Sequence, residues 1–293
     1  MNSVVLIFVD GLGIGMRGEH NPLAELSGDS LIAHFCGERA RVPFGGRLAA
    51  TDPRLGVEGR PQSASGQTTI LTGKNVAKML GRHKHGFPDL RLREVIAEHS
   101  IFRQIRDKRL GPALFANTYT PQFFSSPPRW KSATTCAVEA AALPLMRLPD
   151  LVGGHSLFHD ITNETLVERG FDVAPRPPEE AGRILARLSE RNRFVLFEHF
   201  ITDKIGHERD RAAAREHLPK LDRFVRSCVE AVDLERTTVI LTSDHGNIED
   251  LSIRNHTLND VPTVVWGRHC DQAAAAIGDL THIAPTVLHL LNQ

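Results

Sequence analysis

Five apolar runs, each stopped by polar residues or glycine, recur along the chain with amphipathic segments between them. They are SVVLIFVDG at 3–11, GPALFAN at 111–117, NRFVLFEHF at 192–200, RTTVILTSDHG at 236–246 and VPTVVWG at 261–267. Continuous runs rich in β-branched and aromatic residues are typical of strands that are buried on both faces. We therefore interpret each run as a strand of a covered sheet.

The segments between these runs have helical periodicity. They cover residues 89–108, 178–191, 215–232 and 282–293. Alternating strands and helices predict an α/β fold with a mostly parallel sheet sandwiched between helices. We expect a single domain over residues 1–293. Residues 118–190 are rich in Pro, Ser and Arg, fit the alternation less well, and are predicted to form a small cap or an elaborated loop within it.

Composition limits the classes of partner. The chain has 35 basic and 35 acidic residues, so no global field attracts it to nucleic acid or to an anionic membrane. The apolar run before Asp10 is too short for a membrane span and lacks the features of a signal peptide, which predicts a cytoplasmic protein. The four cysteines are scattered and are expected to be ordinary buried thiols: Cys36, Cys136, Cys228 and Cys270.

Metal-ligand residue types occur where the predicted strands end. In parallel sheets, ligands bind beyond the carboxyl ends of the strands. The candidates are Asp10, Asp203, His207, Asp244, His245 and His256. Imidazole and carboxylate ligands suit zinc or manganese better than calcium, and two such ions could clamp a phosphoryl group. Taken singly, each residue could equally be a turn former or a surface side chain.

The segment PQSASGQTTILTGKN, residues 61–75, offers a candidate nucleophile. Ser63 precedes a glycine and a predicted helix start, and both a helix N-terminus and a metal ion would favour its alkoxide. The alternative is a polar loop rich in Ser and Thr.

The order of these motifs resembles the alkaline phosphatase superfamily, and within it the branch of cofactor-independent phosphoglycerate mutases and phosphopentomutases. The matching segments are FVDGLG, QSASGQ followed by Thr72-Gly73, DKIGH, SDHGNIED, NHTLNDVP and the terminal HIAPTVLHLL. The resemblance implies one metal on Asp203, His207 and His256. It implies a second metal on Asp10, Asp244, His245 and Ser63, with Ser63 phosphorylated. Ser65, Thr68 and Thr69 are the rival nucleophiles, and the spacing to Thr72-Gly73 favours Ser63.

Departures from the branch decide which activity the resemblance implies. Residues 118–190 leave little room for the mutases' large cap, and no counterpart of their substrate-binding Arg and Lys motifs stands out. Glu198 and Lys204 are placed like the alkaline phosphatase residues that serve an auxiliary magnesium and lie near phosphate. A Glu paired with an Arg and a solvated Lys are the alternatives. The sulfatase branch needs Pro and Arg after its nucleophile, which SASGQ lacks.

We therefore expect a phosphohydrolase with two divalent metal ions, zinc or manganese, acting on a small phosphorylated substrate through a phosphoserine. A phosphomutase is the first alternative, and an inactive metal-binding regulatory protein is the second. Candidate groups for holding an anion in the irregular region are Arg129, Lys131, His155 and His159.

Overall fold

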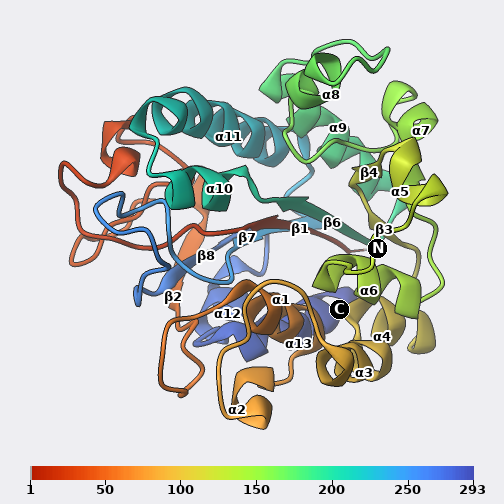
Figure 1. The fold of residues 1–293 in the computed structure, drawn as a ribbon, viewed down its shortest axis with the longest axis horizontal. Coiled ribbons are helices and arrows are strands. Elements are labelled where there is room, and N and C mark those ends of the chain that lie inside the picture. The colour runs from red at the N-terminus through yellow and green to blue at the C-terminus, as the bar shows by residue number, and fades with distance from the viewer. Residues whose placement is uncertain (1) are drawn as a thin grey trace.

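The computed structural model describes residues 2–293 and contains a six-stranded sheet between two layers of helices (Figure 1). The strand order is β2 (Arg47–Thr51), β8 (Val261–Trp266), β7 (Thr237–Thr242), β1 (Ser3–Val9), β6 (Phe194–His199) and β3 (Ala113–Phe115). Strands β7, β1, β6 and β3 are parallel, whereas β8 is antiparallel to both of its neighbours. The predicted α/β fold with a mostly parallel sheet between helices is confirmed.

The central strand β1 is buried on both faces, as its continuous apolar run predicts. Val5, Ile7 and Val9 point into a core shared with α9 (Pro178–Arg191) and α11 (Arg211–Ala231). Val4, Leu6 and Phe8 point into the core on the opposite face. That second face is covered by α1 (Ser63–Thr72), α3 (Leu90–His99), α4 (Ile101–Asp107), α6 (Ala133–Ala140), α12 (Cys270–Ala275) and α13 (Ile283–Leu291).

The five predicted strands are all present, and two details of the prediction were wrong. The edge strand β2 was not predicted, because RLAAT is short and its antiparallel pairing with β8 is not visible in its pattern. The helix predicted over 89–108 is two helices that break at Ser100. The Ser100 backbone leaves the helical region there, with φ −49° and ψ 134°, and its hydroxyl donates to the Ala137 carbonyl at 2.8 Å.

Residues 118–190 combine irregular chain with short elements. These are the two-stranded sheet of β4 (Thr118–Tyr119) and β5 (Met146–Arg147), and the helices α5 (Pro121–Ser125), α7 (Leu148–Val152) and α8 (Glu164–Glu168). Two longer helices of this segment, α6 and α9, pack directly on the central sheet. These two helices belong to the main fold. For the rest of residues 118–190, the small cap stays a prediction.

The remaining helices are α2 (Val76–Leu80) and α10 (Ile201–Glu208), with short 3-10 turns at Pro22–Glu25, Pro43–Gly45 and Leu280–His282. Among the helices of residues 2–293, none has the length and apolarity needed to cross a membrane. The prediction of buried thiols holds for Cys228 and Cys270, whereas Cys36 is exposed and Cys136 is partly exposed. Cys36 lies in a loop after Phe35 rather than in a core element, which explains its exposure.

Candidate metal centre and nucleophile

Three adjacent strands deliver the candidate ligands to one edge of the sheet. Asp10 directly follows β1, and Asp244 and His245 follow the parallel neighbour β7. Strand β6 runs parallel on the other side of β1 and leads into α10, which carries Asp203 and His207. Residues separated by more than 200 positions therefore meet because parallel strands end at the same edge.

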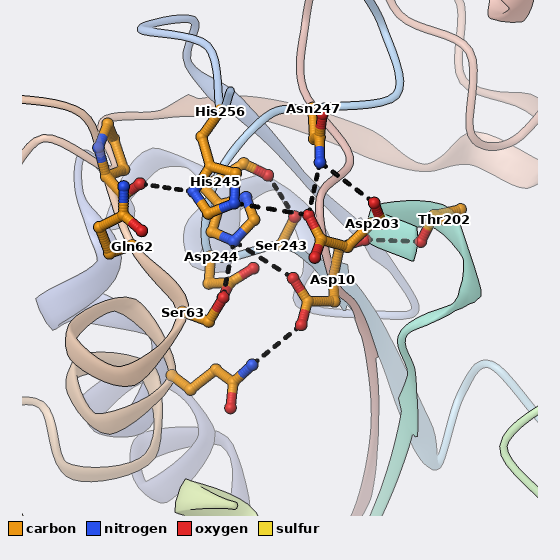
Figure 2. A network of polar contacts seen from close by, with 12 residues as sticks. Asp10, Gln62, Ser63, Thr202, Asp203, Ser243, Asp244, His245, Asn247 and His256 are labelled. Atoms are coloured by element: carbon orange, nitrogen blue, oxygen red, sulfur yellow. Dashed lines mark hydrogen bonds and ion pairs between the residues drawn. The ribbon is translucent and has the colours of Figure 1, made fainter. Parts of the chain in front are cut away.

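Three predicted ligands converge on His245, which is itself the fourth (Figure 2). The Nε2 atom of His245 lies 3.0 Å from Ser63 Oγ, 3.3 Å from Asp10 Oδ1 and 3.6 Å from Asp244 Oδ2. Ligand atoms about 2 Å from a tetrahedral zinc lie about 3.3 Å from one another. The spacing of these donor atoms therefore fits one divalent ion.

The electrostatics of this group also fit a cation. Asp10 and Asp244 are buried, and burial, together with repulsion from neighbouring carboxylates, raises the pKa of both well above the usual range. Within the described chain, Asp10 Oδ1 and both carboxylate oxygens of Asp244 have no hydrogen-bond partner. Burial lowers the pKa of His245 well below its usual value, which leaves the ring neutral with a free lone pair. Unpartnered oxygens and a neutral imidazole suit a divalent ion.

A second group lies beside the first and contains Asp203, His207 and His256. His207 Nε2 is 3.1 Å from His256 Nε2 and 3.4 Å from Asp203 Oδ2, and His256 Nε2 is 3.6 Å from Asp203 Oδ1. The other ring nitrogen of each histidine faces a backbone carbonyl, Pro61 O at 2.8 Å for His256 and Arg254 O at 3.0 Å for His207. An Nδ1–H that donates to a carbonyl leaves Nε2 as the free donor atom toward the ion.

His245 lies within reach of both groups. Its ring stacks on His256 with centroids 3.6 Å apart, and it also forms a compact donor set with Asp203 and His256. We assign it to the Asp10–Asp244 group because its Nε2 faces Ser63 and both of those carboxylates. His207 completes the other group from the solvent side, since its side chain is 44% exposed.

The nucleophile candidates are separated clearly by geometry. Ser63 is the first residue of α1, and its hydroxyl faces the metal-ligand group. The hydroxyls of its rivals bond to the backbone of their own segment: Ser65 to Gln62 O, Thr68 to Ala64 O and Thr69 to Ser65 O. Of these four residues, Ser63 is therefore the one that lies at the N-terminus of the helix and directs its hydroxyl toward a metal-ligand group.

Three further side chains orient the ligands and were not assigned from the sequence. Asn247 Nδ2 donates to Asp203 Oδ1 at 2.6 Å, and Gln67 Nε2 donates to Asp10 Oδ2 at 3.0 Å. Thr202 donates to the Asp10 carbonyl, which joins α10 to the end of β1. One signal was available for Gln67, because it stands four residues after Ser63 and so shares its helix face.

Glu198 and Lys204 lie at the same cavity as the metal ligands. Glu198 is buried at the end of β6, and burial raises its pKa to about 7, partly opposed by a hydrogen bond from Thr134. Its negative charge contributes to raising the pKa of Asp10, so the two carboxyl groups are close. Lys204 is 69% exposed and lies 4.0 Å from Glu208. Among residues 2–293, no arginine forms an ion pair with Glu198, so the alternative of a Glu paired with an Arg is not observed.

Of the four candidate anion-binding groups, only His159 lines this cavity. Lys131 pairs with Glu139 at 2.7 Å, Arg129 lies over the Trp130 ring, and His155 is exposed elsewhere. Arg169 also lines the cavity and was not among the groups predicted from the sequence. Nothing in the local sequence distinguishes Arg169 from the other arginines of this irregular region.

The fold brings two groups of metal-ligand residue types together at one edge of the sheet, and the proteins that this chain resembles include metal-dependent enzymes. The Metalloenzyme superfamily model matches residues 161–293. A phosphopentomutase from Alkaliphilus metalliredigens is 24% identical over 209 residues, covering 68% of this chain and 50% of the relative. A 2,3-bisphosphoglycerate-independent phosphoglycerate mutase from Desulforudis audaxviator is 31% identical over 130 residues, covering 42% of this chain and 25% of the mutase.

Among solved structures, a cold-active alkaline phosphatase from a psychrophilic Shewanella species is similar along the whole chain. The TM-score is 0.57 at 12% identity, covering 99% of this chain and 100% of that one. These matches confirm the resemblance at the level of the fold: the chain has the alkaline phosphatase fold, and residues 161–293 match the Metalloenzyme superfamily model. It spans only half the length of the phosphopentomutase and a quarter of the mutase.

Proposed function

We propose that this protein is a dinuclear metal-dependent phosphohydrolase that cleaves a phosphate ester through a phosphoserine at Ser63. One observation carries the proposal. The Ser63 hydroxyl, at the N-terminus of α1, meets His245 Nε2 at 3.0 Å in a group that also contains Asp10 and Asp244. A hydroxyl among metal-ligand atoms and a helix N-terminus is placed to act as a nucleophile.

The residues present would hold two ions. Asp203, His207 and His256 would bind one, and Asp10, Asp244, His245 and Ser63 would bind the other. The mixture of imidazole and carboxylate donors favours zinc or manganese. An auxiliary magnesium would bind beside Glu198 and Asp10. When bound, divalent ions would lower the pKa of the Ser63 hydroxyl and stabilise negative charge on the phosphoryl and leaving oxygens.

The chemistry at Ser63 has two halves. In the first, Ser63 Oγ loses its proton and forms a bond to phosphorus while the bond from phosphorus to the ester oxygen breaks, and the released alcohol takes up a proton. In the second, a water oxygen bonds to phosphorus while the Ser63 Oγ–phosphorus bond breaks, which frees phosphate and restores the hydroxyl. Gln67 and Asn247 hold Asp10 and Asp203 in place throughout.

Access of water supports hydrolysis over transfer to a second hydroxyl of the substrate. A mutase has to exclude water while the phosphoserine exists. Here His207 is 44% exposed and Lys204 is 69% exposed at the cavity that Ser63 lines. An open cavity lets water reach the phosphoserine.

The test uses protein loaded with zinc or manganese and a panel of phosphate esters that includes phosphoglycerates and pentose phosphates. We expect release of inorganic phosphate and a trapped phosphoserine at position 63. Ser63→Ala should lower kcat by about a thousandfold or more. Ser65→Ala is the matched control, and should keep kcat within about tenfold because its hydroxyl bonds to Gln62 O.

Three other outcomes would reject the proposal, and each would identify a different alternative. Isomerised substrate without free phosphate would identify a mutase, the activity that the phosphopentomutase relative is named for. Two bound ions with no turnover of any ester would identify a metal-binding protein without this activity. Loss of activity in Ser65→Ala with retention in Ser63→Ala would reassign the nucleophile.

A further inference from the structure

The cavity beside Ser63 concentrates aromatic side chains. It has a volume of about 750 Å³, and Asp10, Ser63, Gln67 and Asp203 line one part of it. Its aromatic lining is Phe87, Phe115, Tyr119, Phe123, Phe158 and Phe200. These include the only tyrosine of a chain that has 14 phenylalanines and 6% aromatic residues. A volume of this size is typical of pockets that hold ligands much larger than phosphate.

Two of these rings leave large apolar surfaces uncovered at the cavity. Phe87 is 50% exposed and Phe200 is 41% exposed. Phe200 has one face against His159, with ring centroids 4.2 Å apart and an angle of 27° between the planes. Burial keeps His159 neutral by lowering its pKa to about 4, so this wall is an uncharged stack of rings. Exposed rings that line a cavity indicate a ligand that covers them.

The polar groups in the aromatic part are mostly paired within the protein. The Tyr119 hydroxyl bonds to Thr135 Oγ1 at 2.8 Å, and Thr135 Oγ1 bonds to Ser132 Oγ at 2.8 Å. Tyr119 in turn packs on Phe123 with ring centroids 4.5 Å apart. A polyol or glycerate leaving group needs several free hydrogen-bond partners, whereas the hydroxyls of Tyr119, Thr135 and Ser132 already bond to one another.

Cations lie beside the stack. Arg169 and Lys204 line the cavity, and their charges contribute to lowering the pKa of His159, so both are near its ring. Guanidinium and ammonium groups next to aromatic faces attract ring systems as well as anions. The cavity therefore combines a charged metal-ligand end with a wall suited to a flat ring.

We propose that the substrate is a phosphate monoester whose leaving alcohol carries a planar aromatic ring, held against Phe200 and the Tyr119–Phe123 pair. This inference rests on the proposed function, because Ser63 would attack the phosphorus of that ester. It names a substrate class that neither the sugar nor the glycerate relatives are named for.

The test compares two esters whose alcohols have similar acidity, 2-phenylethyl phosphate and ethyl phosphate, with metal-loaded enzyme. We expect kcat/KM to be at least about tenfold higher for the phenylethyl ester. Phe200→Ala should lower kcat/KM for the phenylethyl ester about tenfold and change the ethyl ester by less than about twofold. Phe44→Ala is the matched control, because Phe44 is 40% exposed and lies outside the cavity lining.

A second measurement keeps this inference separate from the proposed function. Calorimetry with metal-loaded Ser63→Ala protein compares binding of 2-phenylethylphosphonate and ethylphosphonate, which cannot be hydrolysed. Tighter binding of the aromatic phosphonate that Phe200→Ala removes supports the inference even without turnover. Equal binding of the two phosphonates overturns the inference, and so does a higher kcat/KM for ethyl phosphate, glycerol phosphate or a sugar phosphate. In either case, release of phosphate would still support the proposed function.

Discussion

Gly66 allows α1, whose first residue is the proposed nucleophile Ser63, to approach the metal-ligand group closely. A Cβ on Gly66 would lie 2.8 Å from Asp244 Cβ, closer than real Cβ atoms approach other atoms, and 3.0 Å from the Asp244 carbonyl oxygen. Gly66 stands in the first turn of α1, three residues after Ser63. The contact between Gly66 and Asp244 therefore positions the Ser63 hydroxyl.

We expect Gly66→Ala to lower kcat by at least about tenfold, because moving the first turn of α1 displaces Ser63 from the reacting phosphorus. The measurement is steady-state phosphate release at saturating metal, with circular dichroism to show that the variant folds. Gly28→Ala is the control, since no atom lies within 4 Å of the corresponding Cβ. A Gly66→Ala enzyme with kcat within twofold of the parent would contradict the positioning role.

At the residue scale, much of the candidate site was predictable from the sequence. Acidic and histidine residues directly after apolar runs mark the ends of strands, and the structure brings Asp10, Asp203 and Asp244 together there. The orienting role of Asn247 was not predictable, because it depends on how closely α10 approaches the loop after β7. That approach needs Gly206, where a Cβ would meet the Asn247 side chain at 2.6 Å.

At the scale of elements, one buried carboxylate joins three loops around the site. Gly13 N and Asn247 N donate to Glu249 Oε2 at 3.1 and 2.7 Å. The Thr257 hydroxyl and Asn259 Nδ2 donate to Glu249 Oε1. Glu249 thus connects the loop after β1 and its own loop after β7 to the segment that carries His256.

Glu249→Gln should destabilise the fold by about 2 kcal/mol or more, because an amide nitrogen would face two of these four donors in a buried place. Urea unfolding of metal-free protein measures the change. The exposed Glu94→Gln is the control and should stay within about 0.5 kcal/mol. A free energy of unfolding unchanged in Glu249→Gln would mean that the loops are held by other contacts.

Helices α9 and α11 pack closely at Gly182, where a Cβ would overlap the Phe224 carbonyl oxygen and lie 2.8 Å from Ser227 Cβ. Alanine is the better helix former by about 1 kcal/mol. We nevertheless expect Gly182→Ala to lower the free energy of unfolding by about 1 to 3 kcal/mol, because the added methyl group would clash with backbone atoms of α11, which can move only if the helix moves. Urea unfolding measures it, and a stabilised variant would show that the two helices can separate without loss.

The elements that sequence patterns predicted well are those whose burial is decided locally. Strand β1 is apolar at every position because helices cover both of its faces, so its run is unmistakable. Strand β2 has only two buried positions in five and is recognisable only through its pairing with β8. The break at Ser100 likewise depends on a distant partner, since its hydroxyl bonds to Ala137 of α6.

At the scale of the whole molecule, several histidines outside the proposed ligand set are buried or half-buried. Burial lowers the pKa of His34, His159 and His217 to about 4, and that of His199 well below its usual value. A histidine whose pKa is lower in the folded state than in the unfolded state stabilises the fold above the unfolded pKa, near 6.5. That stability is lost as pH falls from 6.5 toward 4. Together these residues predict acid lability.

His34 tests this expectation away from the metal centre, because its ring is 5% exposed and Nε2 has no hydrogen-bond partner among residues 2–293. Because the pKa values of Asp10 and Asp244 are raised, these two groups make the metal-free protein less stable as pH rises, which is the opposite effect. Both carboxyl groups are present in the variant and in the parent, so their effect cancels when the two proteins are compared. Replacing His34 by Leu removes one proton that the unfolded chain binds and the folded chain does not. Between pH 6.5 and 4, the slope of unfolding free energy against pH should therefore decrease by up to about 1.4 kcal/mol per pH unit. Urea unfolding of metal-free His34→Leu and parent protein measures both slopes. Above pH 7.5 the two curves of unfolding free energy against pH should run parallel. If they also run parallel below pH 6.5, His34 is not a source of the acid lability.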